Sequence, residues 1–132
     1  MLERISVRTH KRCELVDITE EIQKLIIKSK IADGTLHVYC PHTTAAVTVN
    51  ENCDPSVRTD ISTTLSELVP HQGNYEHSEG NADAHVKASI VGCERTLFVE
   101  EGKICFGTWQ GVYLCEFDGP RSREVWVKII KE

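Results

Sequence analysis

Two kinds of hydrophobic spacing recur along the chain, and they divide it into short strands and three helices. Near the start, Ile5 and Val7 alternate with polar residues, which is typical of a half-buried strand. Further on, Ile22, Leu25 and Ile26 repeat at the spacing of one helical face. The same reasoning predicts strands at 3–9, 13–18, 36–40, 45–50, 94–100, 103–107, 109–118 and 123–131, and helices at 19–30, 55–69 and 83–91.

The expected helix ends carry recognisable signals. Thr19 is expected to cap the first helix, and Asp54 followed by Pro55 is a typical start for the second. Gly92 is expected to end the third helix in a left-handed conformation. Because strands lie at both ends of the sequence with helices between them, we predict one α+β domain over residues 1–132, with a largely antiparallel sheet.

Length and composition narrow the class of protein. The 132 residues, 40% hydrophobic and 27% charged, are enough for one globular core but not for two ordinary ones. A net charge of −5 argues against a nucleic-acid partner, because non-specific binding depends on clustered Lys and Arg. No apolar stretch is long enough to span a bilayer, and the N-terminus lacks the apolar centre of a secretory signal. We therefore expect a cytoplasmic protein with no membrane partner.

The six cysteines show no CxxC pair and no zinc-ribbon spacing. Four of them lie in apolar runs, where a free thiol behaves as a small hydrophobic group. Reduced thiols are therefore predicted. Cys40 and Cys53 lie near His42 and Asp54, and a role for either cysteine as a nucleophile is left open.

The strongest candidate site is a segment in which polar and small residues alternate. His77, Glu79, Asn81, Asp83 and His85 are separated by Ser, Gly or Ala. In an extended chain all five side chains would share one face, whereas in a helix Asn81 and His85 would lie one turn apart. The small spacers let the backbone approach a ligand closely. We predict that these five residues, with His42, form the catalytic group.

Other segments supply the substrate- and phosphate-binding candidates Thr43, Thr44, Asp54, Gln110, Arg121 and Arg123. The two threonines place hydroxyl donors beside His42, which can act as an acid, a base or a ligand. Asp54 is explained by a helix cap, and the same helix start can also bind an anion. Two arginines beside a glycine can hold phosphate in bidentate fashion, although a hairpin tip with solvated charges explains them equally.

Taken in order, several blocks of the chain closely resemble the YjbQ family, also called the secondary thiamine-phosphate synthase family. The blocks are His42-Thr-Thr-Ala, Asn50-Glu-Asn with Asp54-Pro55, His77-x-Glu-Gly-Asn-Ala-Asp-Ala-His85, Gly107-Thr-Trp-Gln110 and Glu116-x-Asp-Gly-Pro-Arg121. The resemblance covers nearly the whole chain. Cys53 stands where a small residue such as Ala is expected.

The resemblance implies an α+β domain that contains a β-sandwich, a homotrimer, and a metal or anion site near subunit boundaries. It also implies thiamine-phosphate synthase activity, in which hydroxymethylpyrimidine diphosphate and thiazole phosphate are joined with release of pyrophosphate. For that reaction Glu79 and Asp83 could hold Mg²⁺ while His42 assists proton movement. Arg121, Arg123 and the helix start after Asp54 could bind the leaving pyrophosphate.

Two alternatives remain open from the residues themselves. His42, His77 and His85 form a three-histidine set that suits Zn²⁺, Fe²⁺ or Ni²⁺ better than Mg²⁺, which favours a metal-dependent hydrolase of a small anionic substrate. Alternatively, the same residues hold a metabolite or metal in a trimer without catalysis, because no nucleophile stands out. The expected partner is a small phosphorylated metabolite, and the expected cofactor is a divalent metal, Mg²⁺ or Zn²⁺.

Overall fold

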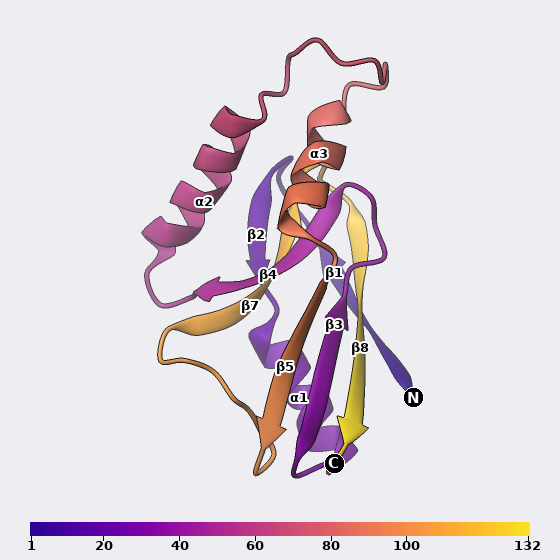
Figure 1. The fold of residues 1–132 in the computed structure, drawn as a ribbon, viewed down its shortest axis with the longest axis vertical. Helices are drawn as coiled ribbons and strands as arrows, with labels where there is room; N and C mark the ends of the chain where they lie inside the picture. Colours follow the sequence, from indigo (N-terminus) through magenta and orange to yellow (C-terminus); the bar gives the residue numbers. More distant parts are fainter.

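The computed structural model describes all of residues 1–132, which form two antiparallel sheets and three helices (Figure 1). The strands are β1 (Leu2–Arg8), β2 (Glu14–Asp17), β3 (Gly34–Tyr39), β4 (Ala45–Glu51), β5 (Glu94–Glu100), β6 (Lys103–Ile104), β7 (Gln110–Glu116) and β8 (Ser122–Lys131). The helices are α1 (Thr19–Ser29), α2 (Pro55–Leu68) and α3 (Ala82–Val91). The predicted α+β class is therefore confirmed.

The larger sheet has five strands in the order β1-β8-β3-β5-β6, and every neighbouring pair is antiparallel. Its inner face carries alternate apolar residues such as Val38 and Val127, both fully buried. Ile22 and Ile26 of α1 are buried in the same core. The alternation seen in the sequence thus places one face of this sheet against α1 and the smaller sheet.

The smaller sheet has the order β2-β7-β4, with β7 in the middle. Val112 and Leu114 of β7 point into the core shared with the larger sheet. Tyr113 and Cys115 point to the opposite side, where residues of α2 and α3 pack against them. This double coverage explains why β7 is buried almost throughout its length, and it fixes α3 close to the ends of β4 and β7.

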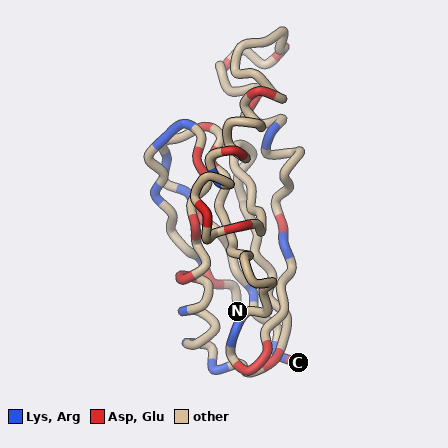
Figure 2. Tube along the Cα trace, turned by 90° about the vertical axis from the view of Figure 1, so that its left-hand side faces the viewer, with Lys and Arg blue, Asp and Glu red and all other residues tan.

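Helix α2 is attached differently from the other two helices. It lies along the outside of the smaller sheet (Figure 1), and none of its residues is fully buried. None of the three helices is long and apolar enough to cross a lipid bilayer. Lysine and arginine are interspersed with acidic residues along the whole trace rather than gathered in one segment (Figure 2).

Three details differ from the sequence predictions. Thr19 does not cap α1; its hydroxyl donates to Asp17 Oδ1 at 2.6 Å and accepts from the Val112 amide at 2.9 Å, which ties the helix start to β7. Gly92 has a positive φ of 102° but an extended ψ of 161°, because the chain turns directly into β5. The strand predicted at 103–107 is only Lys103–Ile104. All six cysteines are free thiols.

Candidate functional site

A polar hollow of about 390 Å³ lies where three segments distant in sequence meet. These are the connection from β3 to β4, the segment that enters α3, and the connection from β7 to β8 (Figure 1). The lining residues are Pro41, His42, Thr43, Thr44, Glu79, Asn81, His85, Asp118, Arg121 and Arg123. None has a large hydrophobic side chain. Eight of the residues predicted from the sequence therefore surround one cavity, and Pro41 and Asp118 join them.

The Glu116 side chain fixes the connection from β7 to β8 through several hydrogen bonds. This carboxylate is fully buried and accepts hydrogen bonds from the amides of Phe117 and Asp118, both at 3.0 Å, and from the Thr9 hydroxyl at 2.7 Å. It also forms a two-pronged ion pair with Arg123, whose Nε lies 2.9 Å from Oε1. Burial alone would raise the pKa of Glu116, but the hydrogen bonds from Arg123, the Asp118 amide and Thr9 hold it below its usual range.

Arg123 is held in one orientation by these contacts. Its side chain is 5% exposed, and Nη2 donates to the Thr44 hydroxyl at 2.9 Å in addition to Glu116. The protein partners of this guanidinium use Nε and Nη2, and none uses Nη1. Because Arg123 lines the hollow, Nη1 is a fixed donor available to a ligand.

The backbone of the same connection comes unusually close to its neighbours at Gly119. A Cβ atom at this position would lie 2.3 Å from the Lys11 carbonyl oxygen, so only glycine fits. The Gly119 amide donates to the Arg12 carbonyl at 2.9 Å. This close packing fixes the approach of Asp118 and Arg121 to the hollow.

His42 has a defined protonation pattern. Its Nε2 accepts a hydrogen bond from the Glu124 amide at 2.9 Å, so the proton of the neutral ring is on Nδ1. Burial is the main cause that lowers the pKa of His42, and the positive charge of Arg123 lowers it further. At neutral pH, His42 is therefore an uncharged ring that can donate a hydrogen bond from Nδ1.

A chain of hydrogen bonds crosses the rim of the hollow. His77 Nε2 lies 2.9 Å from Asn81 Oδ1, and Asn81 Nδ2 donates to Asp118 Oδ2 at 2.8 Å. Arg121 completes the chain, because Nη2 donates to the same Asp118 oxygen at 2.9 Å and Nε donates to the Asp118 carbonyl at 2.7 Å. Burial would raise the pKa of Asp118, but the bonds from Asn81 and Arg121 lower it. The chain orients Arg121 while its Nη1 has no protein partner.

His85 stands beside this chain without joining it. Its ring meets the ring of His77 edge-on, with 5.2 Å between the centroids. Neither ring nitrogen of His85 has a hydrogen-bond partner in the protein, although the ring lines the hollow. Of the predicted catalytic residues, His85 is thus the one whose nitrogens are both free for a ligand.

Asp83 lies outside the hollow, fully buried on the other side of α3. It pairs with Arg12, at 2.9 and 3.1 Å, and with Lys87 Nζ at 3.3 Å. The reason is the helix: α3 begins at Ala82, so Asp83 is rotated about 200° from Asn81 while His85 returns to the same side. Of the two geometries considered for this segment, the helical one holds, and Asp83 belongs to the framework.

Asp54 and Gln110 also lie away from the hollow. Asp54 caps α2 by accepting from the Ser56 amide at 2.9 Å. Gln110 accepts from the Gly107 amide at 2.8 Å and pairs with Glu51 at the start of β7. The hollow adjoins the opposite end of β7, about 20 Å away along a strand of this length. Both residues stabilise local turns.

The proposed metal ligands do not form a ligand set in the folded chain. His42 uses Nε2 for the Glu124 amide, and His77 uses Nε2 for Asn81. Asp83, proposed to share Mg²⁺ with Glu79, is buried in its ion pairs. No three His, Cys, Asp or Glu side chains are grouped as metal ligands. The residues as arranged do not fit the expected Mg²⁺ or Zn²⁺ site, and metal binding stays a prediction.

Four residues that matter here were not predicted from the sequence. Asp118 and Glu116 lie in the segment Glu116–Arg121, but their spacing gave no sign that Asp118 lines the hollow and that Glu116 is buried. Arg12 and Lys87 gave no local signal, since only the fold brings them to Asp83. A buried Lys, here 1% exposed, is recognisable only from the structure.

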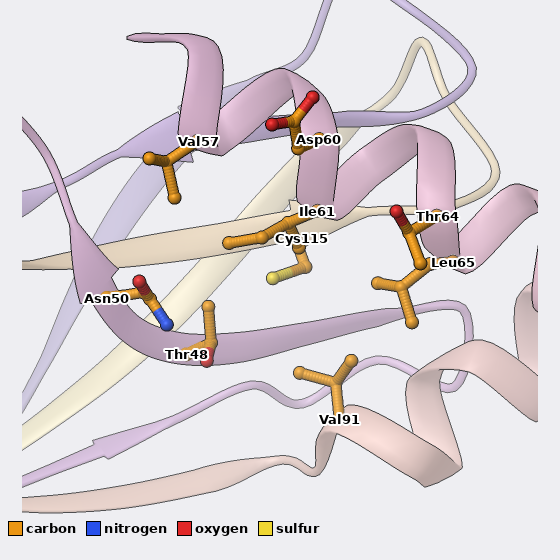
Figure 3. Close-up of a pocket in the computed structure, with 9 residues that line it drawn as sticks. All are labelled: Thr48, Asn50, Val57, Asp60, Ile61, Thr64, Leu65, Val91 and Cys115. Atoms are coloured by element: carbon orange, nitrogen blue, oxygen red, sulfur yellow. The ribbon is translucent and has the colours of Figure 1, made fainter. Parts of the chain in front are cut away.

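A larger and more apolar groove, about 450 Å³, lies between α2 and the smaller sheet. Figure 3 shows Val57, Ile61 and Leu65 of α2 facing Thr48 and Cys115 across it. It contains none of the predicted site residues and no histidine or arginine. The chemistry of the chain is therefore concentrated in the polar hollow.

Comparison with known proteins settles the relationship of the chain. A family model described as UPF0047 protein YjbQ-like matches residues 3–132. The chain belongs to this family. It is 54% identical over 130 residues to UPF0047 protein MJ1081 of Methanocaldococcus jannaschii, covering 98% of this chain and 94% of that one. It is 44% identical over 131 residues to UPF0047 protein YugU of Bacillus subtilis, covering 98% and 99%.

Solved structures of YjbQ-like proteins confirm the fold. An uncharacterized conserved protein of this family from Clostridium acetobutylicum superposes with a TM-score of 0.95 at 47% identity, covering 97% of this chain and 99% of that one. A hypothetical protein from Aeropyrum pernix superposes with a TM-score of 0.95 at 35% identity, covering 100% and 99%. The likeness supports the family and the fold.

Proposed function

We propose that the polar hollow binds a small phosphorylated metabolite and that His85 exchanges a proton with it. The observation that carries this proposal is the fixed guanidinium of Arg123, a residue that lines the hollow and whose Nη1 has no protein partner. An arginine already oriented by Glu116 and Thr44 loses little side-chain freedom when it binds phosphate.

Further donors converge on the same space. Arg121 offers Nη1, His42 offers Nδ1–H, and the Thr43 hydroxyl lines the wall. Each arginine is paired with one carboxylate, so the ligand is bound by directed N–H and O–H groups more than by net charge. Glu79, exposed at the rim and 3.7 Å from His77, is the acidic group that favours a protonated or hydroxyl-bearing part of the ligand.

The chemistry follows from the free ring of His85. When a nucleophile forms a bond to carbon and displaces phosphate or pyrophosphate, a proton donor assists by neutralising the leaving oxygen. The unpartnered imidazole of His85 beside the phosphate can supply that proton. The synthase activity implied by the family resemblance, with pyrophosphate as leaving group, is one reaction of this class. The three-histidine hydrolase has no comparable support, since its ligand set is not assembled.

Binding of inorganic pyrophosphate to the purified protein, followed by titration calorimetry, tests the proposal. Arg121→Ala should weaken binding about tenfold or more, the loss expected for a charge-assisted hydrogen bond. Lys24→Ala removes one positive charge from α1, away from the hollow, and should leave the affinity unchanged. Absence of binding in the wild-type protein, or equal loss in both variants, overturns the assignment.

Turnover is measured separately. Hydroxymethylpyrimidine diphosphate and thiazole phosphate are incubated with the wild-type protein and with His85→Asn, and released pyrophosphate is quantified. The proposal expects release by the wild-type protein and a loss of about 100-fold or more in the variant, with pyrophosphate affinity retained. Binding without turnover for this pair and other phosphorylated metabolites would leave a non-enzymatic binding protein. The homotrimer implied by the resemblance stays a prediction, to be checked by light scattering.

A further inference from the structure

A third cavity, of about 230 Å³, lies between α2 and the segment that enters β2. It shares no lining residue with the polar hollow or with the apolar groove. Helix α2 lines it with four residues at the spacing of one helical face: Arg58, Thr59, Ser62 and Thr63. Lys11 and Glu14, at the entrance to β2, supply the polar part of the other wall. Helix α2 therefore presents an apolar face to the groove and a separate polar face to this cavity.

Arg58 differs from every other arginine in the chain. Each of the others has a hydrogen-bond or ion-pair partner in the protein. Arg58 has none, and its Nε is the only buried side-chain nitrogen or oxygen without a hydrogen-bond partner. A buried donor left unsatisfied opposes folding, so such an atom in a folded protein calls for an explanation. An anionic ligand in the adjoining cavity supplies one.

The guanidinium of Arg58 is nevertheless held in place. Its Cζ lies 5.4 Å from the centre of the Tyr113 ring, which is fully buried. The Tyr113 hydroxyl donates to the Glu51 carbonyl at 2.8 Å, so the ring itself is fixed. A ring face attracts the positive charge but offers no lone pair to the N–H donors. Arg58 is therefore an oriented cation whose donors remain available to an anion.

Other groups around the cavity are also free to donate. The ammonium group of Lys11 forms no ion pair in the protein, and the hydroxyls of Ser62 and Thr63 have no protein partner. Glu14 is the one acidic residue of the lining, and its Oε2 already accepts from the amides of His10 and Lys11, at 2.5 and 2.9 Å. The cavity thus combines two unpaired cations with one carboxylate that is bound to the backbone.

We infer that this cavity is a second anion-binding site, which takes a tetrahedral oxyanion such as a phosphate group. Two cationic side chains and two free hydroxyls offer more donors than the two oxygens of a carboxylate use, whereas phosphate accepts on four oxygens. A guanidinium matches phosphate through paired N–H groups. The inference is independent of the proposed function, because no residue of the polar hollow takes part.

The Nε–H signal of Arg58 in ¹H–¹⁵N spectra reports on this site directly, because the buried Nε is protected from exchange with water. The signal is assigned through its absence in Arg58→Lys. Titration with sodium phosphate should shift it to saturation, whereas sodium chloride at the same ionic strength should not. Sodium acetate should bind at least about fivefold more weakly. A signal that phosphate leaves unmoved, or that chloride moves equally, overturns the site, and equal affinity for acetate overturns the tetrahedral ligand.

Two matched variants test the position of the anion. Thr63→Ala removes a hydroxyl that lines the cavity and should weaken phosphate binding at Arg58 about three- to tenfold. Thr64→Ala removes the same group from the next position of α2, which lines the apolar groove instead, and should leave the affinity unchanged. Equal effects of the two substitutions contradict the inference.

The variant Arg121→Ala separates this site from the polar hollow. It removes a cation from the hollow and should leave the Arg58 titration intact. Loss of the Arg58 shift in that variant overturns the second site alone. Failure of pyrophosphate to bind in the hollow, with the Arg58 shift preserved, overturns the proposed function alone.

Discussion

At the scale of single residues, the buried carboxylate of Glu116 fixes the residues around the site. It is the counter-ion of Arg123 and the acceptor for two consecutive backbone amides. A buried ion pair adds little stability compared with apolar packing, but removal of one partner leaves an uncompensated charge. The position is therefore sensitive to loss of charge even when shape is preserved.

Glu116→Gln should lower the free energy of unfolding by about 3–5 kcal/mol, because the Arg123 guanidinium remains buried without its counter-ion. Urea unfolding followed by circular dichroism measures this change. Glu100→Gln alters an exposed strand residue in the same way and should shift stability by less than about 0.5 kcal/mol. A Glu116 variant as stable as this control would contradict the role given to the ion pair.

Asp83→Asn tests whether Asp83 stabilises the fold without contributing to the ligand site. Asp83 is fully buried between Arg12 and Lys87, so loss of its charge should cost about 3–5 kcal/mol of stability. Because the side chain does not reach the hollow, pyrophosphate affinity measured below the unfolding temperature should match that of the wild-type protein. If the folded variant no longer binds pyrophosphate, Asp83 contributes to the site after all.

At the scale of elements, local patterns predicted the strands and helices well where one face is buried. The alternation around Ile5 and Val7 and the helical face of Ile22 and Ile26 correspond to real burial. Signals that depend on tertiary partners were less reliable. Thr19 is a residue type that often caps helices, but its hydroxyl instead accepts a hydrogen bond from the Val112 amide of β7.

The site was predictable to the extent that its residues lie in unusual local sequence. His42, Asn81, His85 and Arg121 were found because small or polar neighbours surround them. Whether a residue in such a segment faces the ligand depends on the phase of α3, and the sequence left both an extended and a helical geometry open. Asp83 is an example: because α3 begins at Ala82, the Asp83 side chain points away from the hollow and is buried.

Asp54 tests whether a helix start is structural or also binds anions. Asp54→Ala removes the acceptor for the Ser56 amide and hydroxyl, at 2.9 and 2.7 Å, and should lower the melting temperature by about 3–6 °C. Pyrophosphate affinity should not change, because Asp54 does not line the hollow. Asp54→Ser, which preserves a capping hydroxyl, should recover most of the melting temperature. Weaker pyrophosphate binding in Asp54→Ala would assign this helix start to the site.

At the scale of the whole molecule, three buried or half-buried acids couple the site to the stability of the domain. Burial raises the pKa of Glu116, Asp83 and Asp118. Hydrogen bonds from cationic or amide donors lower it by more, so the pKa of each acid lies below its ordinary value. Asp83 lies in α3, Glu116 ends β7, and Asp118 lies in the β7–β8 connection. Protonation of these acids therefore loosens the elements that shape the hollow.

This coupling predicts that the protein loses stability in acid. Because the three carboxyls have lower pKa values in the folded than in the unfolded state, their stabilisation is fully present above the ordinary values of about 4 and is lost as the pH falls through the folded values. Urea unfolding midpoints should be nearly constant from pH 7 to 5.5 and fall steeply below about pH 4. In Glu116→Gln, already less stable at neutral pH, the fall should be shallower, because one of the responsible carboxyls is missing. An equally steep fall in this variant would show that other groups govern the acid transition and that Glu116 is not bound as the structure describes.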